Sequence, residues 1–240
     1  MTDAAEQRDA VIAQLRSNPA VKRVEVIGGQ TLILGDSRLI TVGLPKPHGI
    51  VTDPPYGIGA DTGVGKYGRT RGFKAGWDSE APDLGFLPAV PSIIWGGNYF
   101  PLPPSRAFLI WDKGAGFKGR DFAECEMAWC SFDANARILS YDPLARGDYR
   151  GGNKQHPTQK PVALMEWCLG FLPAATTILD PFAGSGSTLV ACQKLGRLGT
   201  GIEIDPEYWT VACERVHKAW QEPDLFIEQA APKAQQEVLI

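Results

Sequence analysis

The stretch of residues 176–190, near the end of the chain, constrains the fold more than any other. It consists of a β-branched apolar run, an acid followed by a proline, and the glycine-rich segment Phe-Ala-Gly-Ser-Gly. A helical spacing of apolar residues then starts at Ser187. This is the strand–turn–helix order of a Rossmann-like nucleotide site, where glycines let the backbone approach a ligand closely.

A second apolar segment, residues 199–204, strengthens this interpretation. It carries Glu203 near the spacing of about 20 residues after the glycines at which an acid meets ribose hydroxyls. Two features argue against a dehydrogenase. Leu189 occupies the position of the third glycine, and Asp180 would repel a pyrophosphate. An acid at that turn suits a cationic ligand better.

Length and composition indicate one globular α/β domain. The chain has 240 residues, of which 44% are hydrophobic and 21% charged. No apolar run approaches the roughly 20 residues of a membrane helix, and the first residues lack the pattern of a signal peptide. We therefore expect a cytoplasmic protein with no membrane partner.

The five cysteines form no Cys-x-x-Cys pair and have no histidine at ligand spacing. We expect reduced cysteines in the core and no metal site.

Basic residues gather in two irregular stretches, although the net charge of −3 does not indicate a nucleic-acid binder. The first stretch, 57–80, is rich in glycine, and the second covers 134–155. A long aperiodic loop in a compact domain is usually functional. A local basic surface can hold phosphates, and a solvated loop is the alternative. The candidate DNA-binding residues are Lys66, Arg69, Arg71, Lys74, Arg146 and Arg150.

Apolar strands alternate with helical patterns along the chain, which predicts a mostly parallel sheet covered on both faces. An additional strand at 126–132 is expected to run antiparallel to its neighbour. Ligands bind beyond the carboxyl ends of such strands. Four acids fall at predicted strand ends and should meet at one edge: Asp36, Asp53, Asp180 and Glu203. We interpret this edge as a functional site. The predicted parallel strands are 31–36, 49–55, 92–97, 107–112, 176–180 and 199–204.

The tetrapeptide Asp53-Pro54-Pro55-Tyr56 is the most specific motif in the sequence. Its two prolines fix φ and donate no backbone hydrogen bond. The Pro54 carbonyl can therefore face a ligand beside the Asp53 carboxylate and the Tyr56 ring. Two acceptors and a flat aromatic ring suit an exocyclic amino group on a planar base. A strand stop followed by a turn is the structural alternative.

With this tetrapeptide the chain resembles the S-adenosylmethionine-dependent DNA amino-methyltransferases of the permuted β group. Four motifs occur in that group's order over roughly 31–215: the tetrapeptide, 156–161 (His-Pro-Thr-Gln-Lys-Pro), 182–186 and 201–205. The resemblance implies a Rossmann-like methyltransferase fold with a mostly parallel seven-stranded sheet, one antiparallel strand and permuted motif order. It also implies a single catalytic domain, 1–240, with DNA-contacting insertions at 57–80 and 134–155.

The resemblance assigns a role to each motif. Asp53 and the Pro54 carbonyl would grip the target amino group, and Tyr56 would stack on the base. On the cofactor side, Asp180 would lie near the methionine amino group and Glu203 would bind the ribose hydroxyls. The remaining implied site residues are Pro55 of the tetrapeptide, Phe182, Gly184, Ser185 and Gly186 lining the cofactor cleft, Asp36 at the cofactor adenine, and Thr158 and Lys160 at the methionine carboxylate.

The implied activity is methylation of adenine N6 in double-stranded DNA. Family members whose tetrapeptide begins with Asp are mostly adenine enzymes, whereas cytosine-N4 enzymes mostly carry Ser. A cytosine-N4 enzyme, an enzyme acting on RNA or a protein amide, and an inactive DNA- or cofactor-binding protein are the alternatives. Cytosine-C5 methylation is disfavoured because no Pro-Cys nucleophile is present. A restriction partner and a homodimer stay open at this point.

Overall fold

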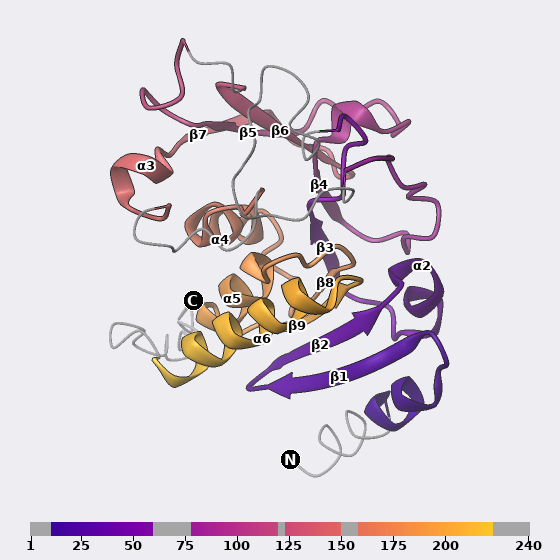
Figure 1. Ribbon diagram of the computed structural model, residues 1–240. Coiled ribbons are helices and arrows are strands. Elements are labelled where there is room, and N and C mark those ends of the chain that lie inside the picture. Colours follow the sequence, from indigo (N-terminus) through magenta and orange to yellow (C-terminus); the bar gives the residue numbers. More distant parts are fainter. Residues whose placement is uncertain (1–10, 60–77, 120–122, 150–157, 223–240) are drawn as a thin grey trace, which may run out of the picture.

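The computed structural model describes residues 11–59, 78–119, 123–149 and 158–222 (Figure 1). Its centre is a nine-stranded sheet with the order β1-β2-β9-β8-β3-β4-β6-β5-β7. The strands are β1 (Val21–Ile27), β2 (Gln30–Gly35), β3 (Gly49–Thr52), β4 (Ser92–Trp95), β5 (Phe108–Asp112), β6 (Cys125–Cys130), β7 (Arg137–Ser140), β8 (Thr177–Asp180) and β9 (Leu198–Glu203).

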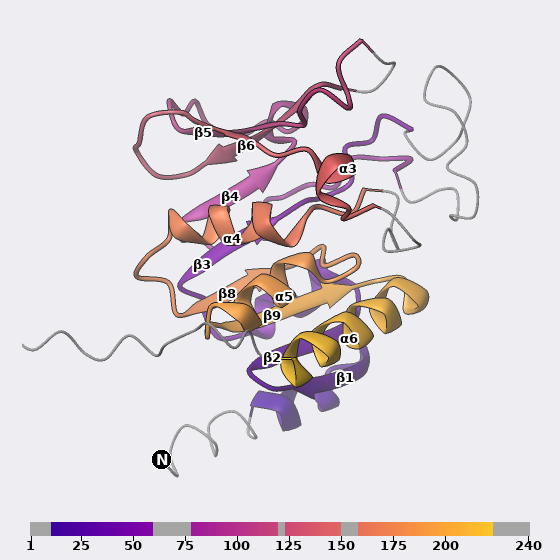
Figure 2. The same cartoon turned by 90° about the vertical axis from the view of Figure 1, so that its left-hand side faces the viewer.

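The sheet is covered on both faces, as the alternation of strands and helices predicts. One face carries α4 (Val162–Gly170), α5 (Ser187–Lys194) and α6 (Pro206–Gln221), which lie side by side in Figures 1 and 2. The other face packs against residues 11–17, α2 (Ser37–Ile40) and the segment near Leu87. The largest core cluster lies between α4 and the middle strands, and it contains the fully buried Trp95.

Local sequence explains where the helices begin. Asp205 caps α6 by accepting hydrogen bonds from the backbone N–H groups of Glu207 and Tyr208, and a proline follows at the first helical position. Pro161 directly precedes α4 and occupies its N-cap position. A short helix, α3 (Pro143–Arg146), begins in the same way at Asp142.

The predicted α/β class and mostly parallel sheet are confirmed, but the prediction of seven strands with one antiparallel is wrong. The sheet has nine strands, and both β1 and β6 run antiparallel to the others. β1 and β7 were missed because they are edge strands with almost no buried side chains. Such strands need no continuous apolar run. β7 and α3 also order part of the stretch 134–155, which the sequence predicted to be irregular.

The cysteines only partly follow the prediction of core positions. Cys130, Cys168 and Cys192 are buried, whereas Cys125 is exposed at the start of β6. None of the helices in the described residues is both long enough and apolar enough to cross a membrane.

Candidate active site

Four parallel neighbours, β2, β9, β8 and β3, end at one edge of the sheet. The arrowheads of β4 and β9 in Figure 2 point toward this edge. Asp180 and Glu203 are the last residues of β8 and β9, and Asp36 and Asp53 directly follow β2 and β3. The four acids therefore lie along one edge, as the sequence predicts.

Asp53 uses both carboxylate oxygens within the chain. Its Oδ1 accepts a hydrogen bond of 2.6 Å from the Tyr56 hydroxyl, and its Oδ2 lies 2.5 Å from the Nζ of Lys160. Burial raises the pKa of Asp53, and the positive charge of Lys160 opposes that rise. The tetrapeptide thus carries a half-buried carboxylate that is held in a defined orientation.

Tyr56 is fixed from several sides. Its ring stacks on Tyr99 with 4.8 Å between centroids and 15° between planes. It also lies against Gly96, where a Cβ would fall 2.0 Å from Cε1 of Tyr56. Asp78, only 1% exposed, accepts hydrogen bonds from the backbone N–H groups of Tyr56 and Gly57 at 2.7 and 2.8 Å. Burial raises the pKa of the Tyr56 phenol, so the hydroxyl stays protonated and donates to Asp53.

Lys160 contacts the tetrapeptide and a neighbouring strand. Its side chain is buried, and its Nζ contacts Asp53 and also Oε2 of Glu126 at 2.9 Å. Burial alone would lower the pKa of Lys160, but the two carboxylates raise it above its ordinary value. The ammonium is thus paired with Asp53 of the tetrapeptide and with Glu126, and its assignment to the methionine carboxylate stays a prediction.

Glu126 and Lys113 belong to the same charge network and were missed from the sequence. Oε1 of Glu126 lies 2.6 Å from Nζ of Lys113, which directly follows β5. Burial would raise the pKa of Glu126, but Lys160 and Lys113 lower it to about 2. The available signal was weak: a charged residue inside the otherwise apolar strand β6, opposite Trp111.

The glycine-rich turn after β8 has the expected backbone conformation. Gly184 and Gly186 have φ angles of 52° and 78°, and α5 begins at Ser187. The N–H of Gly184 donates to Oε2 of Glu203 at 2.8 Å, and the N–H of Asp205 donates to Oε1 at 2.8 Å. Burial nevertheless raises the pKa of Glu203 to about 7.

Asp180 is the second acid at this turn, and it is only 3% exposed. It accepts hydrogen bonds from the Thr52 hydroxyl at 2.7 Å and from the Phe182 N–H at 3.2 Å. Burial raises the pKa of Asp180 to about 6. Within the described parts of the chain, neither Asp180 nor Glu203 forms an ion pair. Two such carboxylates fit a ligand that brings its own cation and hydroxyl donors.

Two further predicted cofactor residues have partners within the chain. Asp36 forms an ion pair of 2.6 Å with the exposed Arg38, and it caps α2. Arg38 accordingly lowers the pKa of Asp36. Ser185 accepts hydrogen bonds from Nη1 of Arg215 through its carbonyl at 2.5 Å and its hydroxyl at 2.8 Å. The Ser185 side chain is therefore used to brace the turn.

The remaining predicted residues are distributed as follows. Phe182 packs edge-on against Phe86 with centroids 6.2 Å apart. Thr158 is half-buried shortly before α4. Arg146 is exposed at the end of α3, with its guanidinium 5.6 Å from the Tyr141 ring. Five candidate DNA-binding residues lie outside the described residues: Lys66, Arg69, Arg71, Lys74 and Arg150.

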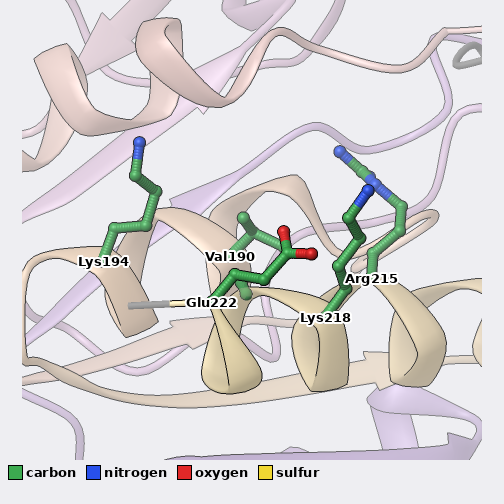
Figure 3. Close-up of a pocket in the computed structure, with 6 residues that line it drawn as sticks. Val190, Lys194, Arg215, Lys218 and Glu222 are labelled. Atoms are coloured by element: carbon green, nitrogen blue, oxygen red, sulfur yellow. The ribbon is translucent and has the colours of Figure 1, made fainter. Parts of the chain in front are cut away.

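A pocket of about 270 Å³ lies between α5 and α6 (Figure 3). Lys218 and Arg215 extend from α6 toward the same side of it, and Lys194 reaches in from α5. Lys194 is already paired with Glu166 at 2.9 Å. This pocket contains none of the strand-end acids. Its connection with the site is Arg215, which reaches Ser185 behind the glycine turn.

Comparisons with known proteins find similarity to DNA methylases. Residues 105–214 match the N6_N4_Mtase family model, described as DNA methylase. This part of the chain is therefore similar to DNA methylases of the N6/N4 family. The match includes Glu126, Lys160, Asp180 and Glu203, whereas the tetrapeptide lies before it.

Two relatives share segments of the chain. "Putative methylase YubD" of Escherichia coli (strain K12) is 40% identical over 88 residues, which is 33% of this chain and 39% of YubD. The Type II methyltransferase M.HpaI of Haemophilus parainfluenzae is 47% identical over 64 residues, 26% of this chain and 20% of the relative. The matches thus span less than half of each relative.

Solved structures show a weaker likeness. The M1.HpyAVI–SAM complex has a TM-score of 0.47 at 20% identity, covering 78% of this chain and 98% of that one. The cytosine-N4-specific PvuII DNA methyltransferase has a TM-score of 0.49 at 14% identity, covering 84% and 95%. Similarity at this level says nothing about the substrate.

Proposed function

We propose that this protein transfers a methyl group from S-adenosylmethionine to the exocyclic N6 of an adenine in double-stranded DNA. The proposal rests on one observation: the tetrapeptide and the glycine turn follow two strands that are neighbours in the sheet. The rigid tetrapeptide follows β3, and the glycine turn with its buried acids follows β8. The Thr52 hydroxyl, just before Asp53, donates to Asp180 and so ties the two together.

The glycine turn is the proposed cofactor site. Asp180 would pair with the methionine ammonium, and Glu203 would accept hydrogen bonds from the ribose hydroxyls. Phe182, Gly184 and Gly186 would line the cleft, and Asp36 would meet the adenine amino group. When bound, the cofactor supplies an electrophilic methyl group on a positively charged sulfur. Ser185 would line this cleft and Thr158 would approach the methionine carboxylate, whereas we assign Lys160 to the tetrapeptide.

The tetrapeptide is the proposed acceptor site. Asp53 and the Pro54 carbonyl would accept the two N–H bonds of the target amino group, with Pro55 holding the turn rigid. These bonds orient the nitrogen lone pair, which is otherwise delocalised into the ring. Alignment of this kind can supply roughly 7–11 kcal/mol of the rate acceleration. The Tyr56 ring, supported by Tyr99, would stack on the extruded base, whose removal from the duplex costs a few kcal/mol.

Adenine is preferred over cytosine because the tetrapeptide begins with Asp, which resembles the adenine enzymes. Cytosine-N4 methylation is the second candidate, since the matching family includes both activities by name. The predicted domain of 1–240, the DNA-contacting insertions 57–80 and 134–155, the cytoplasmic location and a homodimer remain parts of this proposal.

Incubation with methyl-labelled S-adenosylmethionine and duplex DNA, followed by nucleoside mass spectrometry, tests the proposal. We expect N6-methyladenine from the wild type and none from Asp53→Ala. Asp133→Ala is the matched control, because this exposed acid follows the antiparallel strand β6 and lies at the opposite edge. N4-methylcytosine would select the second candidate. Cofactor binding without a methylated base in DNA or RNA would indicate an inactive binding protein.

A further inference from the structure

The environment of Asp53 creates a problem that the proposed reaction must solve. Both carboxylate oxygens already have partners, the Tyr56 hydroxyl on Oδ1 and the Lys160 ammonium on Oδ2. An incoming amino group competes with these two partners for the carboxylate charge, and its bond to Asp53 becomes stronger when one of these contacts weakens. The ammonium contact is the stronger obstacle because it joins opposite charges in a buried site.

Lys160 has a second carboxylate within reach. Its Nζ lies 2.9 Å from Oε2 of Glu126, and the other oxygen of Glu126 is held by Lys113 at 2.6 Å. The ammonium also lies 5.8 Å from the Tyr56 ring centroid and 5.7 Å from that of Trp95. It is therefore confined between two acids and two rings, and it can shift toward Glu126 without leaving the site.

We propose that Glu126 is a positioning residue that takes over the Lys160 ammonium when Asp53 receives the target amino group. Lys113 anchors Glu126 from β5, so the acceptor for the ammonium is in place before the base arrives. Two cations and two carboxylates balance each other in this network. The inference rests on the proposed function and assigns Glu126 a part in that reaction.

Loss of the Glu126 charge should leave Lys160 paired with Asp53 alone. Asp53 is then held more tightly and is less available to the substrate. We expect Glu126→Gln to lower the single-turnover methylation rate by roughly tenfold to 100-fold, within the range known for small misplacements of reacting groups. The Kd for S-adenosylmethionine should change by less than about twofold, because the acids of the glycine turn are untouched.

The pH profile separates positioning from mere structural support. The negative charge of Glu126 contributes to raising the pKa of Asp53, so its removal should lower that pKa. Because the ionised carboxylate of Asp53 accepts an N–H bond more strongly than the protonated acid, the acid limb of the rate profile should move to lower pH in Glu126→Gln. The substitution removes none of the other titratable groups that face Asp53, which are Tyr56, Tyr149, Lys160 and Asp180.

Three variants make the test sharp. Glu126→Asp keeps the charge and should recover most of the rate if charge is what matters. Glu214→Gln removes an exposed acid from α6 and should change neither rate nor pH profile. If Glu126→Gln methylates as fast as the wild type, or if its acid limb does not move, the inference is overturned.

A second readout does not depend on activity. The ¹⁵N signal of the buried Lys160 ammonium, assigned with Lys160→Met, should shift in Glu126→Gln and stay in place in Glu214→Gln. An unchanged signal overturns the inference even if no substrate is found. If the signal shifts but the wild type methylates no base, the proposed function is rejected, whereas the contact between Glu126 and Lys160 is supported.

Discussion

Gly96 shows how a single residue sets the geometry of the acceptor side. Its φ of 65° lies in the left-handed region, and a Cβ there would fall 2.0 Å from Cε1 of Tyr56. We expect Gly96→Ala to displace the Tyr56 ring, to destabilise the fold by about 1–3 kcal/mol, and to reduce methylation. Urea unfolding and the methylation rate measure the two effects.

The control for this substitution is Gly43→Ala. No atom lies within 4 Å of a Cβ at Gly43, and its φ is not positive. This variant should keep wild-type stability within about 0.5 kcal/mol. Equal stability of the two alanine variants would contradict the role given to Gly96.

The two buried acids of the glycine turn predict a pH dependence of cofactor binding. Burial raises the pKa of Asp180 to about 6 and that of Glu203 to about 7. Both acids lose their charge as the pH falls through this range, so affinity for a cationic cofactor should fall between about pH 7 and pH 5. Calorimetric titration checks this, and Asp180→Asn should bind more weakly and flatten the profile.

The same acids should make the cofactor-free protein less stable as the pH rises, although cofactor affinity increases over the same pH range. A raised pKa in the folded state means that the folded protein binds more protons than the unfolded chain between the two pKa values. The cofactor-free protein should therefore lose stability as the pH rises from about 4 to about 7. For Asp180 the shift from 3.8 to about 6 corresponds to about 3 kcal/mol at most. A rise in unfolding free energy over this interval would contradict the assignment.

At the scale of elements, α6 braces the glycine turn through Arg215. Its Nη1 donates to the carbonyl and hydroxyl of Ser185 and to the Ser187 hydroxyl at 3.2 Å. Arg215→Met should weaken cofactor binding and cost about 1–3 kcal/mol of stability, because buried acceptors lose their donor. Lys218→Met, one turn further along α6 at the same pocket, is the control and should have little effect. Cofactor titration and thermal unfolding compare them.

The elements also show which parts of the fold the sequence could predict. The central strands were predictable because they are buried on both faces and form continuous apolar runs, such as Gly49–Thr52. β1 and β7 were not, since an edge strand with exposed side chains lacks that signal. The four acids could be placed together because each falls at a strand end that the sequence predicts, and parallel strands end at one edge of the sheet. The network of Lys113, Glu126 and Lys160 was not, because it joins three elements through side-chain contacts alone.

At the scale of the whole molecule, the sheet order joins two halves that are far apart in the sequence. The tetrapeptide after β3 and the glycine turn after β8 become neighbours only because these strands pair directly. The indigo strand β2 likewise lies beside the orange strand β9 in Figure 1. The site is therefore assembled by strand pairing and not by proximity along the chain.

Binding of duplex DNA provides the prediction that concerns the whole surface. If Lys66, Arg69, Arg71 and Lys74 contact phosphates, each contact contributes about 0.9 to the slope of log Kd against log salt concentration. Replacing all four by alanine should remove up to four such contributions from the slope, and it should weaken binding at low salt. Arg106→Ala is the control, because this exposed arginine is paired with Asp133. Fluorescence anisotropy over a range of salt concentrations measures the slope. An unchanged slope would show that the four residues do not neutralise phosphates, and would direct the search to Arg146 and Arg150.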